Sequence, residues 1–458
     1  MMLCSSEQPI IAQCTPIGAG ALALIRLSGP GALAIATHIS ALAGSKTITT
    51  ATSHTIQFGR VIDDSKETID QVLFLVMHAP KTFTGFDTVE ITCHNNQFIV
   101  EAILQQAIKH GARLAQPGEF SKQAFLNNKI DLTQAEAINE LINAHTQEAI
   151  KKSLEQLEGS FSQWGQSIQQ QLAQALALCE ASFEFLEDET INFDDEIRRI
   201  IGDSLEKINT ACAQYAQQRN LKEGVRIALI GQVNAGKSSL FNALIKQERA
   251  IVTDIAGTTR DVIESGVYCD GFYSTFVDTA GLRHTHDRIE QEGIKRSFQE
   301  ANKADIILLL VDSSRLVQPD ERKMYEQLVR EYGYKIIALA TKSDQKKYTV
   351  AIDAVSFLPV SVISNENIVA LQNLIARKKQ ELLKNCTMPF LINHRQYLLM
   401  QGLEHDLREL EKKVASEMQH ELIAIHLKDA LATFAELTGK TISEQSTNEI
   451  FKQFCVGK

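Results

Sequence analysis

The feature that most constrains this chain is the loop GQVNAGKS at residues 231–238, which matches the pattern G-x-x-x-x-G-K-[ST]. The apolar, β-branched residues 225–230 before it predict a strand, and residues 239–244 after it predict the first turns of a helix. Glycines let the backbone approach phosphate oxygens, and the N–H groups at a helix start favour negative charge. Lys237 is expected to reach the β- and γ-phosphates of a nucleotide, and Ser238 to ligate Mg²⁺. The alternative, a turn that binds nothing, is disfavoured by the flanking strand and helix.

The composition limits the class of protein. A chain of 458 residues predicts about three domains. The net charge of −10 argues against a protein that coats nucleic acid non-specifically, although it leaves room for a local basic patch. No apolar run reaches the length of a membrane span, and the eight cysteines form no C-x-x-C pair. We therefore expect a cytoplasmic protein with reduced thiols and no membrane partner.

Composition shifts predict four segments along the chain. Residues 1–120 read as a mixed α/β domain, with strands near 10–14, 22–27, 55–61, 72–78 and 89–93 and a helix at 99–109. Residues 121–222 read as helical, and apolar positions at three- and four-residue steps predict one long helix over 147–178. The fold class is therefore α/β and α+β multidomain. A nucleotide domain at 223–380 is inserted between two parts of a helical bundle, the second being residues 381–458.

The nucleotide domain is expected to be a doubly wound parallel sheet. Its strands are predicted at 225–230, 274–278, 306–312, 335–341 and 357–360. Polar motifs follow these strands in a set order. Asp278-Thr279-Ala280-Gly281 offers an aspartate for a water on Mg²⁺ and an N–H for the γ-phosphate, and Thr259 offers a hydroxyl for Mg²⁺. Asp344, in Thr341-Lys342-Ser343-Asp344, can accept from the N1–H and 2-amino group of guanine, which favours GTP over ATP.

Transfer of a phosphoryl group to water requires a group that orients water and a positive charge for the transition state. Leu282 stands where a glutamine is usual, so the water-orienting group must come from elsewhere. Arg283, Glu290 and Glu292 lie in the same segment. From the residues alone, each is equally well explained as an ordinary solvent-facing charge.

The chain resembles the tRNA-modification GTPase family called MnmE or TrmE over essentially its full length. The resemblance is carried by the nucleotide motifs and by stretches that other small GTPases lack. The latter are Phe83-Thr84-Gly85, PGEFS at 117–121, AFLNNKIDL at 124–132 and the tail Cys455-Val456-Gly457-Lys458.

The resemblance implies a three-part architecture and a partner. An N-terminal domain would drive homodimerisation and bind 5-formyl- or 5,10-methylene-tetrahydrofolate, and a helical domain would carry an inserted Ras-like GTPase domain. Family members work with a flavin (FAD) protein of the MnmG (GidA) type, expected as a heterotetramer. Together they place a carboxymethylaminomethyl or aminomethyl group on C5 of the wobble uridine of certain tRNAs, and GTP hydrolysis is needed.

The resemblance also assigns site residues. K⁺ would take the place of an arginine finger, with ligands at Asn234, Thr253, Ile255 and Thr258, and Glu290 would orient the water. The GTP-binding set comprises residues 234–239 (Asn234, Ala235, Gly236, Lys237, Ser238, Ser239), residues 253–259 (Thr253, Asp254, Ile255, Ala256, Gly257, Thr258, Thr259), residues 278–281 (Asp278, Thr279, Ala280, Gly281), and Thr341, Lys342, Asp344 and Ser361. Folate would meet Arg26, Glu90, Lys129 and Lys458. Cys455 matches a tail cysteine with a proposed role in modification, and a packed C-terminus is the alternative.

The chain departs from the family pattern at several positions. Thr341 stands where the family has asparagine, so the amide that ties this loop to the phosphate loop is lost and a lower nucleotide affinity is expected. The glycine loop near the N-terminus reads Gly18-Ala19-Gly20-Ala21, and residues 94–96 read His-Asn-Asn. A GTPase switch in ribosome or RNA assembly is the alternative function, and it would leave Lys129 and the tail unexplained. An ATP-dependent kinase or transporter unit is disfavoured by Asp344.

Overall fold

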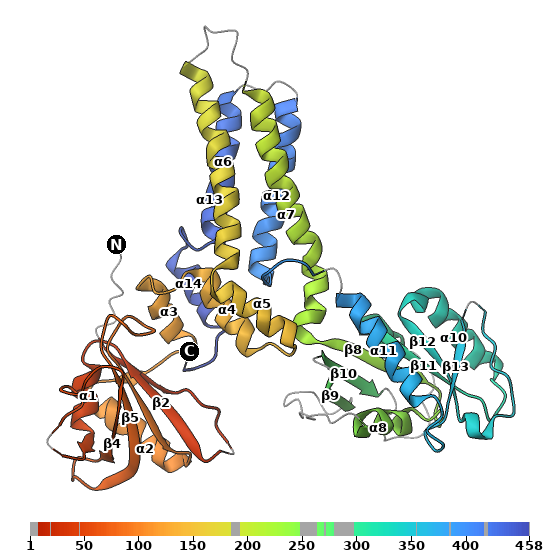
Figure 1. Cartoon of the computed structure of the whole chain (residues 1–458), viewed down its shortest axis with the longest axis horizontal. Coiled ribbons are helices and arrows are strands. Elements are labelled where there is room, and N and C mark those ends of the chain that lie inside the picture. The colour runs from red at the N-terminus through yellow and green to blue at the C-terminus, as the bar shows by residue number, and fades with distance from the viewer. Residues whose placement is uncertain are drawn as a thin grey trace. The chain divides into compact units, whose positions relative to one another are not determined.

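The computed structural model describes residues 8–18, 20–44, 46–184, 193–247, 263–269, 272–278, 297–353, 355–383, 386–415 and 420–457. The chain divides into two compact units. The first comprises Met1–Asn139, Gln156–Glu206 and Leu398–Lys458, and the second comprises Glu140–Glu155 and Lys207–Tyr397. Figure 1 shows the elements of both. The six cysteines whose side chains are described are free, as expected. Among the described residues, no helix has both the length and the apolar character to cross a membrane.

The first unit contains a seven-stranded sheet in the order β3-β4-β5-β6-β2-β1-β7. Its strands are β1 (Ile10–Gln13), β2 (Leu22–Ser28), β3 (Ser40–Leu42), β4 (Thr55–Ile62), β5 (Thr68–Met77), β6 (Thr88–His94) and β7 (Arg113–Leu114). All neighbours are antiparallel except β1 and β7. Helices α1 (Ala32–His38) and α2 (Gln97–Lys109) cover one face. The α/β character expected of this part of the chain is therefore confirmed.

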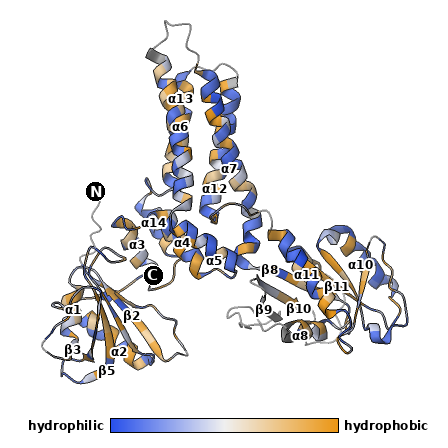
Figure 2. Ribbon diagram, viewed as in Figure 1, coloured by the Kyte–Doolittle hydropathy of each residue, from blue (hydrophilic) through white to orange (hydrophobic). Residues whose placement is uncertain are grey.

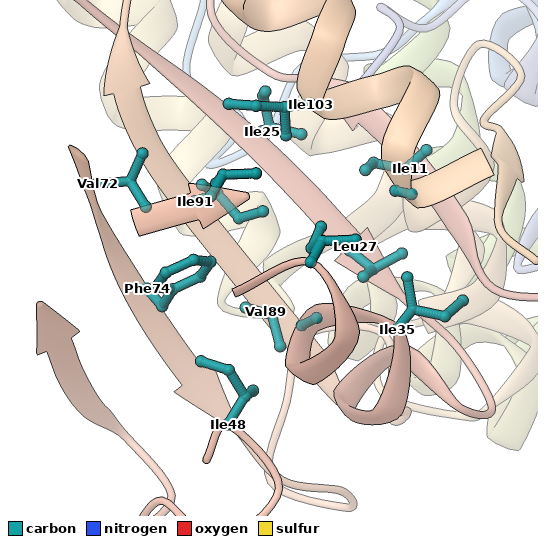
Figure 3. Close-up of a cluster of buried hydrophobic side chains, with 14 of the residues drawn as sticks. Ile11, Ile25, Leu27, Ile35, Ile48, Val72, Phe74, Val89, Ile91 and Ile103 are labelled. Carbon is teal, nitrogen blue, oxygen red and sulfur yellow. The ribbon is translucent and has the colours of Figure 1, made fainter. Parts of the chain in front are cut away.

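Alternation along the strands gives this sheet two different faces. The inner face, with Val72, Phe74, Val89 and Ile91, packs with Ile35 of α1 and Ile103 of α2 in one apolar cluster (Figure 3). On the outer face Ile56, Phe58 and Leu73 are 64, 58 and 42% exposed. The outer face near β1 is covered instead by Phe120 of α3 (Glu119–Leu126), which is fully buried against Ile10 and Ala12.

The helical part comprises α4 (Leu132–Ile142), α5 (Gln147–Leu157), α6 (Ser160–Glu184), α7 (Asp194–Glu223), α12 (His394–Ala415), α13 (His420–Leu437) and α14 (Glu444–Phe451). Helices before and after the nucleotide domain pack together, because Trp164 of α6 lies 6.4 Å from the ring of Phe434 on α13. His420 of α13 lies 2.5 Å from the Ser182 hydroxyl and 2.6 Å from Asp194, which joins the ends of α6, α7 and α13. The bundle with an inserted domain is therefore confirmed.

The single helix predicted over 147–178 is wrong. The structure ends α5 at Leu157 and starts α6 at Ser160. Gly159 separates them with a φ of 102°, a left-handed value at which a helix cannot continue. The apolar spacing continues across the break, so periodicity alone could not reveal it.

The second unit contains a six-stranded sheet in the order β13-β12-β11-β8-β10-β9. The strands are β8 (Val225–Gly231), β9 (Ile263–Cys269), β10 (Phe272–Asp278), β11 (Ile306–Asp312), β12 (Ile336–Thr341) and β13 (Phe357–Val360). The five strands predicted from sequence are parallel, as expected. Strand β9 was not predicted. It pairs antiparallel with β10 at the edge, where only one neighbour is needed and the sequence IESGVYC carries a weaker apolar pattern.

Helices cover both faces of this sheet. Helix α8 (Lys237–Gln247) and α11 (Ile368–Leu383) pack on one face, while α10 (Pro319–Tyr332) packs on the other. Two short 3₁₀ turns, η1 (Gly333–Lys335) and η2 (Ser343–Gln345), flank β12. In Figure 2 strand β11, which is buried throughout, is largely apolar, whereas the bundle helices carry both colours. Burial on both faces explains why β11 shows a continuous apolar run.

Two glycines, which have no side chain, let the C-terminal tail pack closely against the rest of the first unit. A Cβ at Gly118 would lie 2.3 Å from the Phe451 carbonyl oxygen, and one at Gly457 would lie 2.8 Å from the Cα of Cys14. The Gly118 N–H donates to the Cys455 carbonyl at 3.2 Å. Phe451 and Phe454 are 2 and 6% exposed, so the tail is anchored by buried rings on both sides of α14's end.

We predict that Gly118→Ala loosens this tail. Gly118 and Gly31 are both helix N-caps in the left-handed region, with φ of 69° and 83°, but a Cβ at Gly31 meets nothing within 4 Å. Gly31→Ala should therefore cost only the backbone strain, about 1 kcal/mol. Gly118→Ala should cost about 2–4 kcal/mol because the Phe451 backbone must also move. The melting temperature and the protease sensitivity of the last fifteen or so residues measure both; equal effects of the two variants would contradict the contact.

Candidate functional site

The phosphate-binding loop lies at the carboxyl edge of the parallel sheet, between β8 and α8. Gly231 closes β8, and a Cβ there would lie 2.4 Å from the Leu310 carbonyl oxygen of β11. Asn234 and Gly236 have positive φ, 64° and 89°, and the Gln232 carbonyl accepts from the Ala235 N–H at 3.1 Å. The loop therefore has the glycine-dependent geometry that brings backbone N–H groups to the start of a helix.

Lys237 is buried, with 5% of its surface exposed, and its ammonium group is held by the loop. It donates to the carbonyl oxygens of Gly231 at 2.7 Å and Gln232 at 2.8 Å. Ser238 and Ser239 are exposed at the first turn of α8. A buried ammonium group beside a helix N-terminus produces a positive potential that attracts a polyphosphate.

Thr341 ties the base-recognition loop to the phosphate loop through its hydroxyl, and the expected loss of nucleotide affinity stays a prediction. Its hydroxyl donates to the Ala235 carbonyl at 2.8 Å, with a second contact to Val311 O at 3.2 Å. Thr341 is 5% exposed, so this bond is shielded from water. The hydroxyl reaches the Ala235 carbonyl directly because Thr341 ends β12 next to the phosphate loop.

The rest of the base-recognition loop is held by polar side chains. Lys342 has φ of 56° and its ammonium group lies 2.7 Å from Asp312, at the end of β11. Burial alone would raise the pKa of Asp312, but hydrogen bonds from Lys342 and Ser314 outweigh it and hold the pKa below its ordinary value. Ser361 donates to Oδ1 of Asp344 at 2.6 Å, which orients an otherwise exposed carboxylate. An oriented carboxylate can accept two N–H donors from one edge of a base.

Several predicted site residues lie outside the described residues. These are Thr253, Asp254, Ile255, Ala256, Gly257, Thr258, Thr259, Thr279, Ala280, Gly281, Glu290 and Lys458. Asp278 is described only as the last residue of β10, next to Leu229 of β8. Of the expected K⁺ ligands, Asn234 alone is described, and it is exposed in the loop.

Arg26 and Glu90, two of the predicted folate residues, lie on the outer face of the first sheet. Register places Ile56, Leu75, Glu90, Arg26 and Ala12 in one row across β4, β5, β6, β2 and β1. Paired residues in neighbouring strands share a face. On the outer face, the row therefore runs from the exposed Ile56 on β4 to Ala12 on β1, which Phe120 covers.

Arg26 and Glu90 form a half-buried ion pair, with side chains 19 and 15% exposed. The Arg26 Nε and Nη2 atoms lie 2.8 and 2.7 Å from Oε1 of Glu90. The guanidinium carbon lies 5.5 Å from the ring centre of Phe120 and 6.0 Å from that of Phe83. Among the described residues, Oε2 of Glu90 accepts no hydrogen bond, so one carboxylate oxygen of the pair is left without a partner.

The loop at residues 80–85 contacts both Arg26 and Lys129. Phe83 lies beside Arg26, and Lys129 donates through its ammonium group to the Pro80 carbonyl. The Asn127 amide donates to the Thr84 carbonyl at 2.7 Å. Two of the four predicted folate residues, Arg26 and Lys129, thus contact one loop.

The tail reaches the same face. Gly457 O accepts from the Cys14 thiol at 3.3 Å and lies 3.5 Å from an Arg26 nitrogen. Cys455 is exposed, while its carbonyl is bonded to Gly118. The backbone of the tail is therefore packed and the Cys455 side chain faces solvent.

Two site features escaped the sequence prediction. The Gly457 carbonyl accepts from Arg26 and from the Cys14 thiol, and the tail motif in the sequence gives no sign of either backbone contact. Tyr325 bonds the phosphate loop from α10, and only its helical spacing in a buried stripe marks it in the sequence. Spacing of that kind predicts core packing, so its hydroxyl partner could not be inferred.

We predict that Thr341→Val weakens nucleotide binding, because valine keeps the shape and loses the donor, which leaves the Ala235 carbonyl without its side-chain partner. The loss should be about 1 kcal/mol, or about fivefold in Kd for a guanine nucleotide. Thr341→Ser keeps the hydroxyl and is the matched control, expected within about twofold of the parent. Titration with a fluorescent guanine nucleotide measures each Kd. Equal binding by the valine variant would show that the tie does not matter.

Two family models match the chain. One, described as the MnmE helical domain, matches residues 132–455, and the other, the GTP-binding protein TrmE N-terminus, matches residues 9–129. Similar proteins named tRNA modification GTPase MnmE occur in Carboxydothermus hydrogenoformans (35% identical), Enterococcus faecalis (37%) and Aquifex aeolicus (35%). These alignments cover 98–99% of this chain and 98–100% of those proteins.

Among solved structures, the G domain of the Thermotoga maritima FeoB iron transporter is 26% identical and covers 34% of this chain and 99% of that one, with a TM-score of 0.26. Aquifex aeolicus Era bound to GDP and AlF₄⁻ is 20% identical and covers 34% of this chain and 56% of that one, also at 0.26. The family assignment rests on the full-length relatives and the matched family models. The chain belongs to the MnmE (TrmE) family of tRNA modification GTPases.

Proposed function

We propose that this protein is a K⁺-stimulated GTP hydrolase that acts in the modification of tRNA. With a flavin-dependent partner of the MnmG type, it would add a carboxymethylaminomethyl or aminomethyl group to C5 of the wobble uridine. The observation that carries the proposal is the Thr341–Ala235 hydrogen bond, since it joins a phosphate loop to a guanine-type loop. The full-length similarity to proteins named tRNA modification GTPase MnmE supports the tRNA role.

In this proposal each described residue of the nucleotide site has a part. Lys237, which is bonded to the carbonyls of Gly231 and Gln232, would bind the β- and γ-phosphates, and Ser238 would ligate Mg²⁺. Asp344, oriented by Ser361, accepts from the N1–H and 2-amino group of guanine. Lys342 stays near the base through its pair with Asp312. Mg²⁺ would offset charge on the phosphates when bound.

The positive charge at the transition state would come from K⁺. Asn234 supports this, because its amide lies exposed in the phosphate loop and makes no hydrogen bond among the described residues. Thr253, Ile255 and Thr258 would complete the ligand set, with Thr259 as the second Mg²⁺ ligand. Glu290 would orient the attacking water, while Asp278 and the residues that follow it would sense the γ-phosphate.

The N-terminal sheet supports binding of a tetrahydrofolate. A pterin presents neighbouring N–H donors and a flat ring, and Glu90 offers an unpaired oxygen while its partner Arg26 lies beside the Phe83 and Phe120 rings. Lys129 and Lys458 would pair with the carboxylates of the glutamyl part. When bound, the folate would supply one carbon, and the protein's groups would hold and orient it. Cys455 has an exposed thiol that is suited to reaction on this side of the unit.

Homodimerisation through the N-terminal domain also fits the described residues. Ile56, Phe58 and Leu73 form an exposed apolar strip on the outer face of the sheet. Apolar strips of this kind on a sheet face are common at protein interfaces. Ile56 lies in the same row of paired residues as Glu90 and Arg26, and Phe58 and Leu73 lie in a nearby row, so a second copy there would also border the folate residues. The proposed domains are residues 1–120, the N-terminal domain; 121–222 and 381–458, the two parts of the helical domain; and 223–380, the GTPase domain.

We predict that hydrolysis of GTP is at least about tenfold faster in KCl than in NaCl at equal ionic strength, and that ATP is not hydrolysed. Glu290→Ala should lower turnover about 100-fold or more and leave the Kd for GTP unchanged. Glu292→Ala is the matched control and should act like the parent. Phosphate release at several protein concentrations measures the rates. Indifference to K⁺ in folded, nucleotide-bound protein would refute the ion's role, and loss of GTP binding in Glu290→Ala would indicate a structural one.

We predict that deleting the gene removes the C5 modification of wobble uridines, which mass analysis of tRNA nucleosides would detect. The parent protein should restore it, and Lys237→Ala should not, because the phosphate contacts are lost. Unchanged uridines in the deletion strain would favour the alternative, a GTPase switch in ribosome or RNA assembly.

A further inference from the structure

A line of polar groups lies behind the phosphate-binding loop. The hydroxyl of Tyr325, on α10, lies 3.2 Å from the backbone nitrogen of Gln232 and 2.9 Å from Oε1 of Glu321. The two terminal nitrogens of Arg315 lie 2.9 and 2.8 Å from the two Glu321 oxygens. Tyr325 is fully buried and Glu321 is 5% exposed. Arg315, Glu321, Tyr325 and the Gln232 peptide therefore form one continuous chain of hydrogen bonds.

The direction of these hydrogen bonds follows from the charge of Glu321. Burial alone would raise the pKa of its carboxyl, but hydrogen bonds from Arg315, Tyr325 and the Gln318 N–H outweigh burial and hold the pKa below its ordinary value. An ionised carboxylate can only accept hydrogen bonds. The Tyr325 O–H therefore donates to Glu321, and a lone pair of the same oxygen accepts the Gln232 N–H.

The Tyr325 hydroxyl is held rigidly. Glu321 belongs to the capping box at the start of α10, where it accepts from the Gln318 N–H at 3.3 Å. The Tyr325 ring packs in the cluster that joins α10 to the sheet, with Ile230 and Leu309. Both the helix cap and the ring packing fix the oxygen in place before any nucleotide binds.

Gln232 is the point at which this line meets the loop. Its N–H is bonded to Tyr325, and its carbonyl accepts from Lys237 at 2.8 Å and from the Ala235 N–H at 3.1 Å. Restraint of both backbone groups of one residue restrains its φ and ψ, and hence the course of the loop. The adjoining Val233 is 73% exposed, and its N–H donates to the Gln232 side-chain oxygen at 3.4 Å.

We propose that Tyr325 is a positioning residue that keeps the phosphate-binding loop in its nucleotide-binding shape through the Gln232 N–H. The inference rests on the proposed function, which assigns this loop to a guanine nucleotide. A loop ordered in advance loses less conformational entropy when phosphates bind. The benefit belongs to binding of GDP and GTP alike and leaves the hydrolytic step unchanged.

The test compares Tyr325→Phe with Tyr332→Phe in the full-length protein. Tyr332 lies on the same helix, and its hydroxyl makes no hydrogen bond among the described residues. Tyr325→Phe should raise the Kd of GDP and of GTP by the same factor, about fivefold, because the buried Gln232 N–H loses its partner. Its kcat at saturating GTP should stay within about twofold of the parent, and Tyr332→Phe should change neither quantity.

A second measurement uses the parent protein alone, so it does not depend on whether a variant folds. In the parent protein without nucleotide, hydrogen exchange at the Gln232 amide should be slower than at the Val233 amide, because only the former is bonded to a buried hydroxyl. Exchange as fast as that of Val233 would overturn the inference. Unchanged Kd values in Tyr325→Phe, or a fall in kcat with unchanged Kd, would overturn it too. A parent protein that bound no guanine nucleotide would refute the proposed function instead, and exchange at Gln232 would still decide this inference.

Discussion

The close approach of two parallel strands, β8 and β11, determines where the nucleotide site can form. Gly231 ends β8 so near to the Leu310 carbonyl that any side chain would collide with it. The chain must therefore leave the sheet at this point without a Cβ, and it turns through Asn234 and Gly236 into α8. Because β12 and β13 run parallel to these strands, Thr341 and Ser361 arrive at the same edge. The phosphate and base loops are neighbours for this reason, although about a hundred residues separate them in the sequence.

The parts of this architecture that depend on local pattern were predictable from the sequence. Buried strands such as β11 are recognisable in the sequence as apolar runs, and the phosphate loop requires its two glycines in fixed positions. The parts that depend on a single contact were not predictable. The α5–α6 break depends on Gly159 alone, within an unbroken apolar pattern, and β9 depends on one neighbour at the sheet edge.

The Thr341 contact illustrates why residue type alone is not enough to describe a site. The sequence shows that an amide is lost, but only the structure shows that the strand end brings the hydroxyl to within 2.8 Å of the Ala235 carbonyl. The same principle applies to Tyr325, whose spacing identifies a core residue while its hydroxyl bonds the loop. In both cases the chemistry follows from backbone placement, which the sequence pattern records only indirectly. Contacts between residues far apart in the sequence are therefore the part of this site that the sequence could not predict.

The first unit shows the same dependence on distant contacts at its own site. Arg26 needs β6 for its partner Glu90, α3 for the Phe120 ring and the end of the chain for the Gly457 carbonyl. These groups come from segments up to 431 residues apart, so the arrangement forms only after α14 and the tail have docked. The inserted nucleotide domain lies between them in sequence. For a bundle whose last helix completes the first domain's site, an insertion can be tolerated only where it leaves that docking intact.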